Sequence, residues 1–501
     1  MVGKNSQFLK NEDNHFRGAA DAAALLTVVL DRTAREPLAQ QLYRQLRDHI
    51  LARRLGPGAR LPSTRRISED LGVSRTVPLT AYDQLAAEGY VEPRRGSGLY
   101  VGAIGGMDRA DIPTARSLSP GTTRPTLAGR PFDPSAPGED LFPVDLWAKL
   151  MARGWRREGA AVVGQSHPAG LPSLRAAIAR HLYVLRGVSC DAGQIVVTAG
   201  NTDALQLIAQ ALRPERAKQP TVWVEDPGYL SAGATLAREG LRIVPVPVDD
   251  EGLDIEAGIR LAPRATFALV TPARQFPLGM PMSLGRRIAL INWAREIGAV
   301  LIEDDYDSEV RFSGRPLASL QSLDPHQSVL SIGSFSKLTF SGLRLGYIVG
   351  PEPLIQRLIA ARERQGAPVA MSAQPALRLF MEEGGFARHL RGLRRQITQR
   401  RLILTEALQK RLGDELLILP QEVGMHFTVL LDPKLRPRLS DKKIAQDAAR
   451  HGLNLDPLSA HSTAPPGRQG FLLGYAGWSR EAIESGVATL AGLLKPRARE
   501  Q

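Results

Sequence analysis

Val329-Leu330-Ser331-Ile332-Gly333-Ser334-Phe335-Ser336-Lys337 is the stretch of sequence that decides the fold. A short run with several branched apolar residues passes directly into small polar residues and a lysine, which predicts a buried strand that ends at a polar turn. Helical patterns separate this segment from four earlier ones of the same kind, so residues 132–501 are predicted to form an α/β domain around a mostly parallel sheet. The four segments are Ile195–Thr198 before Ala199–Asp203, Thr221–Val224 before Glu225–Tyr229, Phe267–Val270 before Thr271–Gly279, and Ala299–Ile302 before Glu303–Asp307.

The polar segments that follow these strands predict one shared ligand site. In doubly wound sheets, ligands bind beyond the carboxyl ends of the strands. The first of the segments contains Gly200, Asn201 and Thr202 and leads into a helix, whose first N–H groups suit a phosphate. A single lysine such as Lys337 would more often be a surface residue, and a single acidic turn would more often be solvated. Five strand ends at one edge favour a binding site over these alternatives.

A second unit is predicted over residues 34–103. Pro37 suits the start of a first helix, and apolar residues at every fourth position give this helix a buried face. Residues 63–71 predict a second helix, Gly72 a tight turn, and Ser74 the cap of a third helix. Helix, glycine turn and capped helix are typical of a helix-turn-helix. The predicted face of the first helix is Leu38, Leu42, Leu46 and Ile50.

Residues 90–101 consist of two short apolar runs around a basic, glycine-rich tip, which predicts a β-hairpin wing. In a helix-turn-helix the third helix enters the major groove of double-stranded DNA with its N-terminal residues forward. Arg75 and Thr76 are therefore the candidate base readers, with Ser74 beside them. A purely structural three-helix unit with solvated arginines is the alternative. The candidate phosphate contacts are Arg65, Arg66, Arg94 and Arg95.

Four parts are predicted along the chain. Residues 1–33 form an N-terminal extension and residues 34–103 the winged helix-turn-helix. Residues 104–131 are rich in Gly, Pro, Ser and Thr and lack a hydrophobic period, which predicts a linker. Residues 132–501 are the α/β domain.

The composition fits a globular protein with an anionic partner. The net charge of +13 and the pI of about 10.1 favour a nucleic acid, although an arginine-rich proteome would give the same balance. The single cysteine, Cys190, excludes an internal disulfide and a cysteine-rich metal site. No run of apolar residues is long enough to span a membrane, and the polar N-terminus lacks the core of a signal peptide. A cytoplasmic location is expected, with no metal and no membrane partner.

Several motifs resemble known families. Residues 57–101 resemble the winged helix of GntR-type bacterial regulators, above all in LPSTR and VSRTV. Ser334-Phe-Ser-Lys337 followed by Gly342-Leu-Arg344-Leu-Gly-Tyr resembles the lysine and phosphate motif of fold-type-I aminotransferases. The fused arrangement is similar to the MocR/GabR subfamily of GntR-type regulators over about residues 25–490. Further phrases typical of that subfamily are LFPVDLW, PAGLPSLRAAIARHL, TPARQFPLG and IEDDYDSEVRFSGRPLASLQ.

The resemblance implies pyridoxal 5'-phosphate (PLP) as the cofactor. It implies that Lys337 forms the Schiff base and that Asp304 faces the pyridine nitrogen. Tyr306 would contact the ring oxygen, and Tyr229 would stack on the ring. The implied phosphate-binding residues are Gly200, Asn201, Thr202, Ser334 and Arg344, and Ser336 is a further cofactor-binding residue.

The sequence departs from the aminotransferases where these enzymes hold their substrate. Leu472 occupies the position of the arginine that clamps the substrate carboxylate, with Arg468 nearby. Gln165 replaces a tyrosine that contacts the partner subunit's cofactor phosphate. Phe276 replaces the asparagine beside the ring oxygen, and Arg274 stands where the subfamily has a histidine. These changes spare cofactor binding and weaken the binding of amino-acid substrates.

The preferred interpretation is a DNA-binding transcription regulator that senses a small effector through PLP, without physiological turnover. The effector is either PLP itself or an amino compound, such as a sulfonate or a γ-amino acid, held by Arg274 or Arg468. The resemblance also implies a homodimer with a domain-exchanged arrangement as one form. The alternatives are a genuine aminotransferase with an accessory DNA-binding domain and a regulator whose large domain has lost the cofactor.

Overall fold

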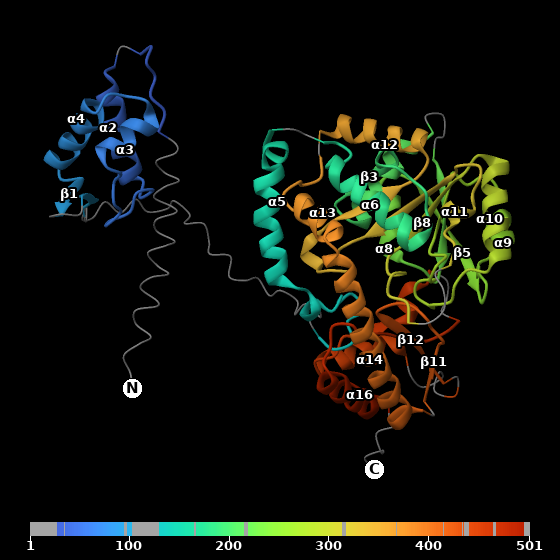
Figure 1. Ribbon diagram of the computed structural model, residues 1–501. Helices are drawn as coiled ribbons and strands as arrows, with labels where there is room; N and C mark the ends of the chain where they lie inside the picture. Colours follow the sequence, from blue (N-terminus) through green and yellow to red (C-terminus); the bar gives the residue numbers. More distant parts are fainter. Residues whose placement is uncertain are drawn as a thin grey trace. The chain divides into compact units, whose positions relative to one another are not determined.

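The computed structural model describes residues 28–34, 36–94, 98–102, 130–164, 167–214, 219–312, 317–366, 368–413, 415–432, 434, 440–463 and 467–494. Contacts within the chain separate two compact units, Met1–Gly121 and Thr122–Gln501, whose folds are drawn in Figure 1. The predicted N-terminal extension lies mostly outside the described residues, and so does the predicted linker. The boundaries of both segments remain predictions.

The small unit is a winged helix. It contains helices α2 (Leu38–Leu51), α3 (Thr64–Leu71) and α4 (Thr76–Ala87) and an antiparallel pair of strands, β1 (Val91–Arg94) and β2 (Gly98–Val101). The predicted face of α2 is buried at Leu42, Leu46 and Ile50 and half-buried at Leu38. The helix order and the wing predicted from the sequence are confirmed.

The turn between α3 and α4 differs from the prediction in one detail. Gly72 ends α3 with a φ of 62°, a left-handed conformation that glycine adopts without strain. Ser74, however, does not cap α4, because α4 begins one residue later than expected and Arg75 occupies its N-cap position without a side-chain hydrogen bond. The Ser74 hydroxyl is instead 2.6 Å from the Thr76 hydroxyl. The prediction of Ser74 as the helix cap was therefore wrong.

The large unit is built on an eight-stranded sheet with the order β3-β10-β9-β8-β7-β4-β5-β6. Strands β5, β4, β7, β8 and β9 are parallel to one another, whereas β6 is antiparallel to β5, and β10 is antiparallel to both β9 and β3. Strand β3 therefore runs in the same direction as β9, so the five predicted strand ends lie at one edge of the sheet. The strands are β3 (Ile195–Thr198), β4 (Thr221–Asp226), β5 (Arg242–Asp249), β6 (Gly252–Leu253), β7 (Phe267–Val270), β8 (Val300–Asp305), β9 (Val329–Ser334) and β10 (Gly346–Val349).

Apolar side chains cover both faces of this sheet. Val222 and Val224 pack into one cluster with α7 (Asn201–Leu212), α8 (Leu230–Arg238) and α12 (Glu352–Gln365). Trp223 points to the opposite face, as strand alternation requires, and packs into a second cluster with residues of α9 (Ile255–Leu261) and α10 (Leu284–Ile297). This layered α/β architecture confirms the predicted fold class (Figure 1).

A smaller subdomain follows in the sequence (Figure 1). Its antiparallel sheet has the order β11-β12-β14-β13, and the long helix α14 (Gly385–Leu412) packs against α16 (Arg480–Leu494). The remaining elements are α5 (Val144–Gly164), α6 (Pro172–Arg186), α11 (Leu320–Leu323), α13 (Gln374–Glu382), α15 (Asp441–Arg450), β11 (Leu416–Ile418), β12 (His426–Leu431), β13 (Asp456–Pro457), β14 (Gly470–Gly474) and the 3-10 helices η1 (Glu139–Leu141), η2 (Ala192–Gln194), η3 (Ser341–Leu343) and η5 (Leu458–His461). Within the described residues, no helix is both long and apolar enough to cross a membrane.

Candidate functional site

A cavity of about 660 Å³ lies at the carboxyl edge of the large sheet. It brings together every residue of the large unit that the sequence predicted to bind the cofactor. Segments far apart in the chain supply them, because the strand ends converge at this edge. These residues are Gly200, Asn201, Thr202, Tyr229, Asp304, Tyr306, Ser334, Ser336, Lys337 and Arg344.

Lys337 lies just beyond β9 and lines the cavity. Its Nζ is 3.5 Å from the Ser135 carbonyl oxygen. Burial lowers the pKa of Lys337, and the carboxylates of Asp307 and Asp133 oppose this shift. A partly buried lysine with a lowered pKa is more readily neutral, and the neutral amine is the form that attacks a carbonyl.

Asp304, near the end of β8, is 6% exposed and accepts a hydrogen bond of 2.6 Å from the side-chain amide of Asn201. Burial raises the pKa of Asp304 to about 7, against the lowering effect of this hydrogen bond. The other amide atom of Asn201, Oδ1, is buried and has no hydrogen-bond partner. A protonated ring nitrogen beside Asp304 would restore the charge balance that favours the carboxylate.

An anion-binding cradle lies at the start of α7. Gly200 occupies the N-cap position with a φ of 102°, and no side chain caps the helix. Arg344, which follows η3, approaches to within 3.8 Å of where a Cβ on Gly200 would stand. The hydroxyl of Ser336 accepts a hydrogen bond from the Leu345 N–H, and Ser334 lines the same cavity. An uncapped helix start beside an arginine suits a phosphate.

Tyr306 and Arg274 form a buried polar group with Asp307. Arg274 donates to the Tyr306 hydroxyl at 2.8 Å and to Asp307 at 2.9 Å. Both members of the ion pair have side chains that are 2% exposed. Arg274 does not line the cavity, whereas Tyr306 and Asp307 do. Arg274 therefore holds the side chains of Tyr306 and Asp307 in position.

One wall of the cavity consists of three aromatic side chains and one carboxylate. We call it the histidine wall and define it as Phe276, His426, His461 and Asp456. The Phe276 ring contacts the rings of His426 and His461, with centroid distances of 5.7 and 5.1 Å. His461 Nε2 is 3.1 Å from an oxygen of Asp456. The sequence reasoning missed Asp456 and His461, because they lie before β14 in a segment without a motif.

Leu472 and Arg468 do not line the cavity. Leu472, on β14, is fully buried in an apolar cluster with Leu278 and Leu458, against which Phe276 packs. Arg468 is half exposed and lies 3.8 Å from Asp250. Neither residue presents a cation to the site, and Gln165 lies outside the described residues.

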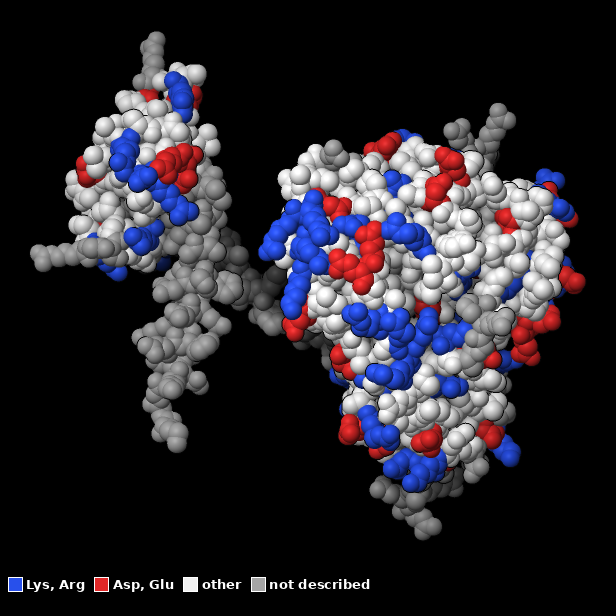
Figure 2. Space-filling view, in the orientation of Figure 1, with Lys and Arg blue, Asp and Glu red and all other residues white. Residues whose placement is uncertain are grey.

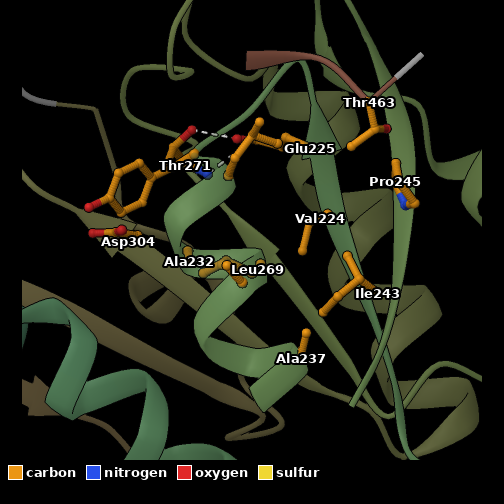
Figure 3. Close-up of a pocket in the computed structure, with 14 residues that line it drawn as sticks. Val224, Glu225, Ala232, Ala237, Ile243, Pro245, Leu269, Thr271, Asp304 and Thr463 are labelled. Atoms are coloured by element: carbon orange, nitrogen blue, oxygen red, sulfur yellow. Dashed lines mark hydrogen bonds between the residues drawn. The ribbon is translucent and has the colours of Figure 1, made fainter. Parts of the chain in front are cut away.

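A second, smaller pocket of about 200 Å³ (Figure 3) adjoins the cavity. The two share Tyr229, Leu230, Thr271 and Asp304. Glu225 lies in this pocket at the end of β4 and accepts hydrogen bonds from the Thr271 hydroxyl at 2.6 Å and the Thr271 N–H at 3.2 Å. Burial raises the pKa of Glu225 to about 7. The sequence reasoning gave Glu225 no role.

The predicted DNA-contacting residues of the small unit that the structure describes are accessible to solvent. Ser74, Arg75 and Thr76 are all exposed at the start of α4, where a recognition helix meets base edges. Figure 2 shows basic side chains spread over the visible face of this unit, with a few acidic ones between them.

The candidate phosphate contacts differ in their surroundings. Arg66 is exposed, whereas the exposed Arg65 forms an ion pair of 3.1 Å with Glu69. On the wing, Arg94 lies over the Tyr100 ring at 4.4 Å. Arg95 lies outside the described residues.

Two sequence families match this chain. The model of bacterial regulatory proteins of the gntR family matches residues 38–101. The model of aminotransferases of class I and II matches residues 137–489.

Curated relatives match nearly the whole chain. The probable rhizopine catabolism regulatory protein MocR of Rhizobium meliloti is 36% identical over 92% of this chain and 95% of its own length. The pyridoxine biosynthesis transcriptional regulator PdxR of Corynebacterium glutamicum is 32% identical over 90% of this chain and 94% of its own. The transcriptional regulator TauR of Rhodobacter capsulatus is 32% identical over 74% and 80%.

Solved aminotransferases share the fold of the large unit. The α-aminoadipate aminotransferase LysN of Thermus thermophilus, complexed with N-(5'-phosphopyridoxyl)-L-leucine, has a TM-score of 0.65 at 28% identity, over 74% of this chain and 93% of its own. The kynurenine aminotransferase of Pyrococcus horikoshii has a TM-score of 0.64 at 25% identity, over 72% and 89%.

Proposed function

This chain belongs to the MocR/GabR subfamily of GntR-type bacterial regulators, and from that premise we propose that it is a transcription regulator that senses a small amine through PLP. The small unit would bind operator DNA, and the cavity of the large unit would hold the cofactor. The observation that carries the proposal is the convergence of Lys337, Asp304 and Arg344 on one cavity, in a chain that also carries a winged helix.

The cavity fits PLP in three independent ways. The uncapped start of α7 and Arg344 suit the phosphate. Asp304 suits the pyridine nitrogen. The side chain of Asn201 beside it has a buried Oδ1 atom without a hydrogen-bond partner, which a bound ligand could supply. Lys337, with its lowered pKa, suits the aldehyde carbon. The phosphopyridoxyl adduct in LysN, a relative with the same fold, supports this assignment.

PLP, when bound, supplies an aldehyde that condenses reversibly with primary amines. Lys337 would hold the cofactor until a free amine takes its place. Asp304 would keep a proton on the ring nitrogen, and Tyr306, oriented by Arg274, would donate a hydrogen bond to the ring oxygen. Tyr229 would lie against the ring.

The part of the cavity where an aminotransferase would bind its substrate carboxylate favours sensing over catalytic turnover. An aminotransferase clamps the carboxylate of its substrate between paired N–H groups of an arginine. Here Leu472 is part of an apolar cluster, and the terminal N–H groups of Arg274 are engaged elsewhere. An amine that enters would replace Lys337 and change the conformation of the chain without rapid conversion to a keto acid. We propose that this change, in a homodimer, alters how the two winged helices engage DNA.

The proposal is tested by DNA binding and absorbance together. A DNA fragment selected from a random library by the purified protein is titrated with the PLP-loaded full chain, with and without a panel of primary amines. At least one amine is expected to shift both the cofactor absorbance and the DNA affinity, the latter by about five- to 150-fold, as coupling free energies between sites usually give. Rapid multiple-turnover formation of a keto product, with no effect on DNA, would instead identify an aminotransferase.

Base reading and phosphate contact by the small unit predict different mutant behaviour. Arg75→Ala is expected to weaken binding to the selected site by about 1–3 kcal/mol and to relax sequence preference at one position. Arg66→Ala is expected to weaken binding to all sequences and to lower the slope of log affinity against log salt by about 1.

These two variants are compared by fluorescence anisotropy at several salt concentrations. Arg44→Ala serves as the control, because Arg44 lies on α2 in an ion pair with Glu36 and belongs to neither α3, α4 nor the wing. Equal loss for the selected and random sequences in Arg75→Ala would contradict the assignment of Arg75 as a base reader.

A further inference from the structure

Within the described residues, the histidine wall offers no free cation that could bind a carboxylate. Building on the function proposed above, we infer that the effector is a primary amine without a carboxylate, whose far end donates hydrogen bonds to the histidine wall. A hydroxyl group and a second ammonium group share this chemistry.

The basic residues that line the cavity are already committed, as far as the described part of the chain shows. Lys337 and Arg344 would hold the cofactor. His426 is buried, and burial together with nearby Arg274 and Lys337 holds its pKa well below the usual range, so its ring is neutral. His461 Nε2 lies 3.1 Å from an oxygen of Asp456, a contact that lacks hydrogen-bond geometry, so any positive charge on this ring is already offset by that carboxylate. A carboxylate that entered would meet the negative charge of Asp456 without a free cation to offset it.

Arg274, which the sequence suggested as a substitute clamp, is not free to act as one. Its two terminal nitrogens carry four N–H groups. These donate to the Tyr306 hydroxyl, Asp307, the Gln421 side chain and the His426 carbonyl oxygen. Reorienting Arg274 toward a ligand would leave Asp307 as an uncompensated buried charge, which is strongly destabilising. Arg468, the other suggested cation, is half exposed and does not line the cavity.

Two groups of the histidine wall call for a ligand that donates hydrogen bonds. His426 Nε2 is buried and lacks a hydrogen-bond partner. The residue is only 3% exposed, and it lines the cavity. A neutral imidazole nitrogen accepts from a hydroxyl or an ammonium group, or donates to a hydroxyl in its other tautomer. The Asp456 carboxylate accepts only. A hydroxyl or ammonium end satisfies both groups, whereas a carboxylate satisfies at most one and is repelled by the other.

The test compares three amines of equal chain length on the PLP-loaded full chain. They are 4-amino-1-butanol, 1,4-diaminobutane and 4-aminobutanoate, and the cofactor absorbance reports binding. The alcohol, the diamine or both are expected to reach half-saturation at a concentration about tenfold or more below that of the acid, as expected when a buried polar group is left unpaired. The order of the alcohol and the diamine then tells whether the far end is a hydroxyl or an ammonium group.

Asp456→Asn is expected to weaken the response to the preferred amine by about tenfold and to reduce the discrimination against 4-aminobutanoate. Asp250→Asn is the matched control, because Asp250 is an exposed carboxylate beside Arg468 outside the cavity. A response to carboxylate-bearing amines alone, or to no amine at all, would overturn the inference. Absence of the lysine-bound cofactor band before any amine is added would overturn the proposed function instead, so the two failures are distinct.

Discussion

Replacing Lys337 with alanine is expected to abolish the visible absorbance band of the lysine-bound cofactor. Lys337 lines the cavity that gathers the other candidate cofactor residues, and its pKa is lowered by burial. Among the described residues that line the cavity, Lys337 is the one with a primary amine, which can form a Schiff base with an aldehyde. The variant is also expected to lose the effect of amines on DNA affinity while its basal DNA binding stays within about twofold, since the winged helix folds around a core of its own.

Absorbance, mass spectrometry after borohydride reduction and anisotropy with the selected DNA measure these effects. Reduction traps the cofactor on its lysine, so the wild-type peptide that contains Lys337 gains the mass of the phosphopyridoxyl group. Lys149→Ala is the control, since Lys149 lies on α5 and does not line the cavity. A labelled peptide elsewhere in the chain, or an unchanged band in Lys337→Ala, would contradict the role of Lys337.

Five of the eight strands described in the large sheet could be predicted from the sequence, because a local run of apolar residues marks each of them, whereas β5, β6 and β10 were not predicted. Five runs of branched apolar residues were assigned as strands, and all five form β3, β4, β7, β8 and β9. Their polar ends converge because parallel strands end at the same edge. Lys337 and Asp304 were placed by the motifs that follow two of those strands. The structure extends β4, β8 and β9 by two or three residues beyond the apolar runs, since backbone pairing does not require an apolar side chain.

The rest of the site depends on contacts between distant segments, which the sequence does not encode locally. Arg274 looked like a free cation because its partner Asp307 lies 33 positions later and its other partner, Gln421, lies 147 positions later. His461 lies on η5, which packs against α15, β13 and β14, so its place at the cavity depends on tertiary contacts. The helix cap at Ser74 failed for a local reason, because α4 starts one residue later than the serine requires.

Asp304→Asn is expected to lower the affinity for PLP by about ten- to a hundredfold, as the loss of a hydrogen bond to a charged group predicts. An asparagine keeps the shape of the side chain but cannot hold the charge that stabilises a protonated ring nitrogen. Equilibrium dialysis of PLP against the cofactor-free protein measures the change. Tight binding of PLP by Asp304→Asn would show that another group protonates the ring.

Glu225→Gln is the matched control for this experiment. Glu225 and Asp304 are both buried carboxyl groups that line the same smaller pocket (Figure 3), and burial raises the pKa of each to about 7. Their ordinary pKa values are 4.5 and 3.8. A raised pKa in the folded state means that the folded protein binds more protons than the unfolded chain between these values, so the free energy of unfolding falls as the pH rises toward 7.

Without cofactor, each substitution should therefore flatten the fall in the free energy of unfolding between about pH 4 and pH 7. Urea denaturation at a series of pH values measures this effect. Only Asp304→Asn should also weaken PLP binding, because Glu225 does not line the cavity that gathers Lys337 and Arg344. Two carboxyl groups with the same burial and the same raised pKa would then be separated by which of them the cofactor touches. Equal loss of PLP affinity in both variants would instead mean that PLP binding depends on both carboxyl groups.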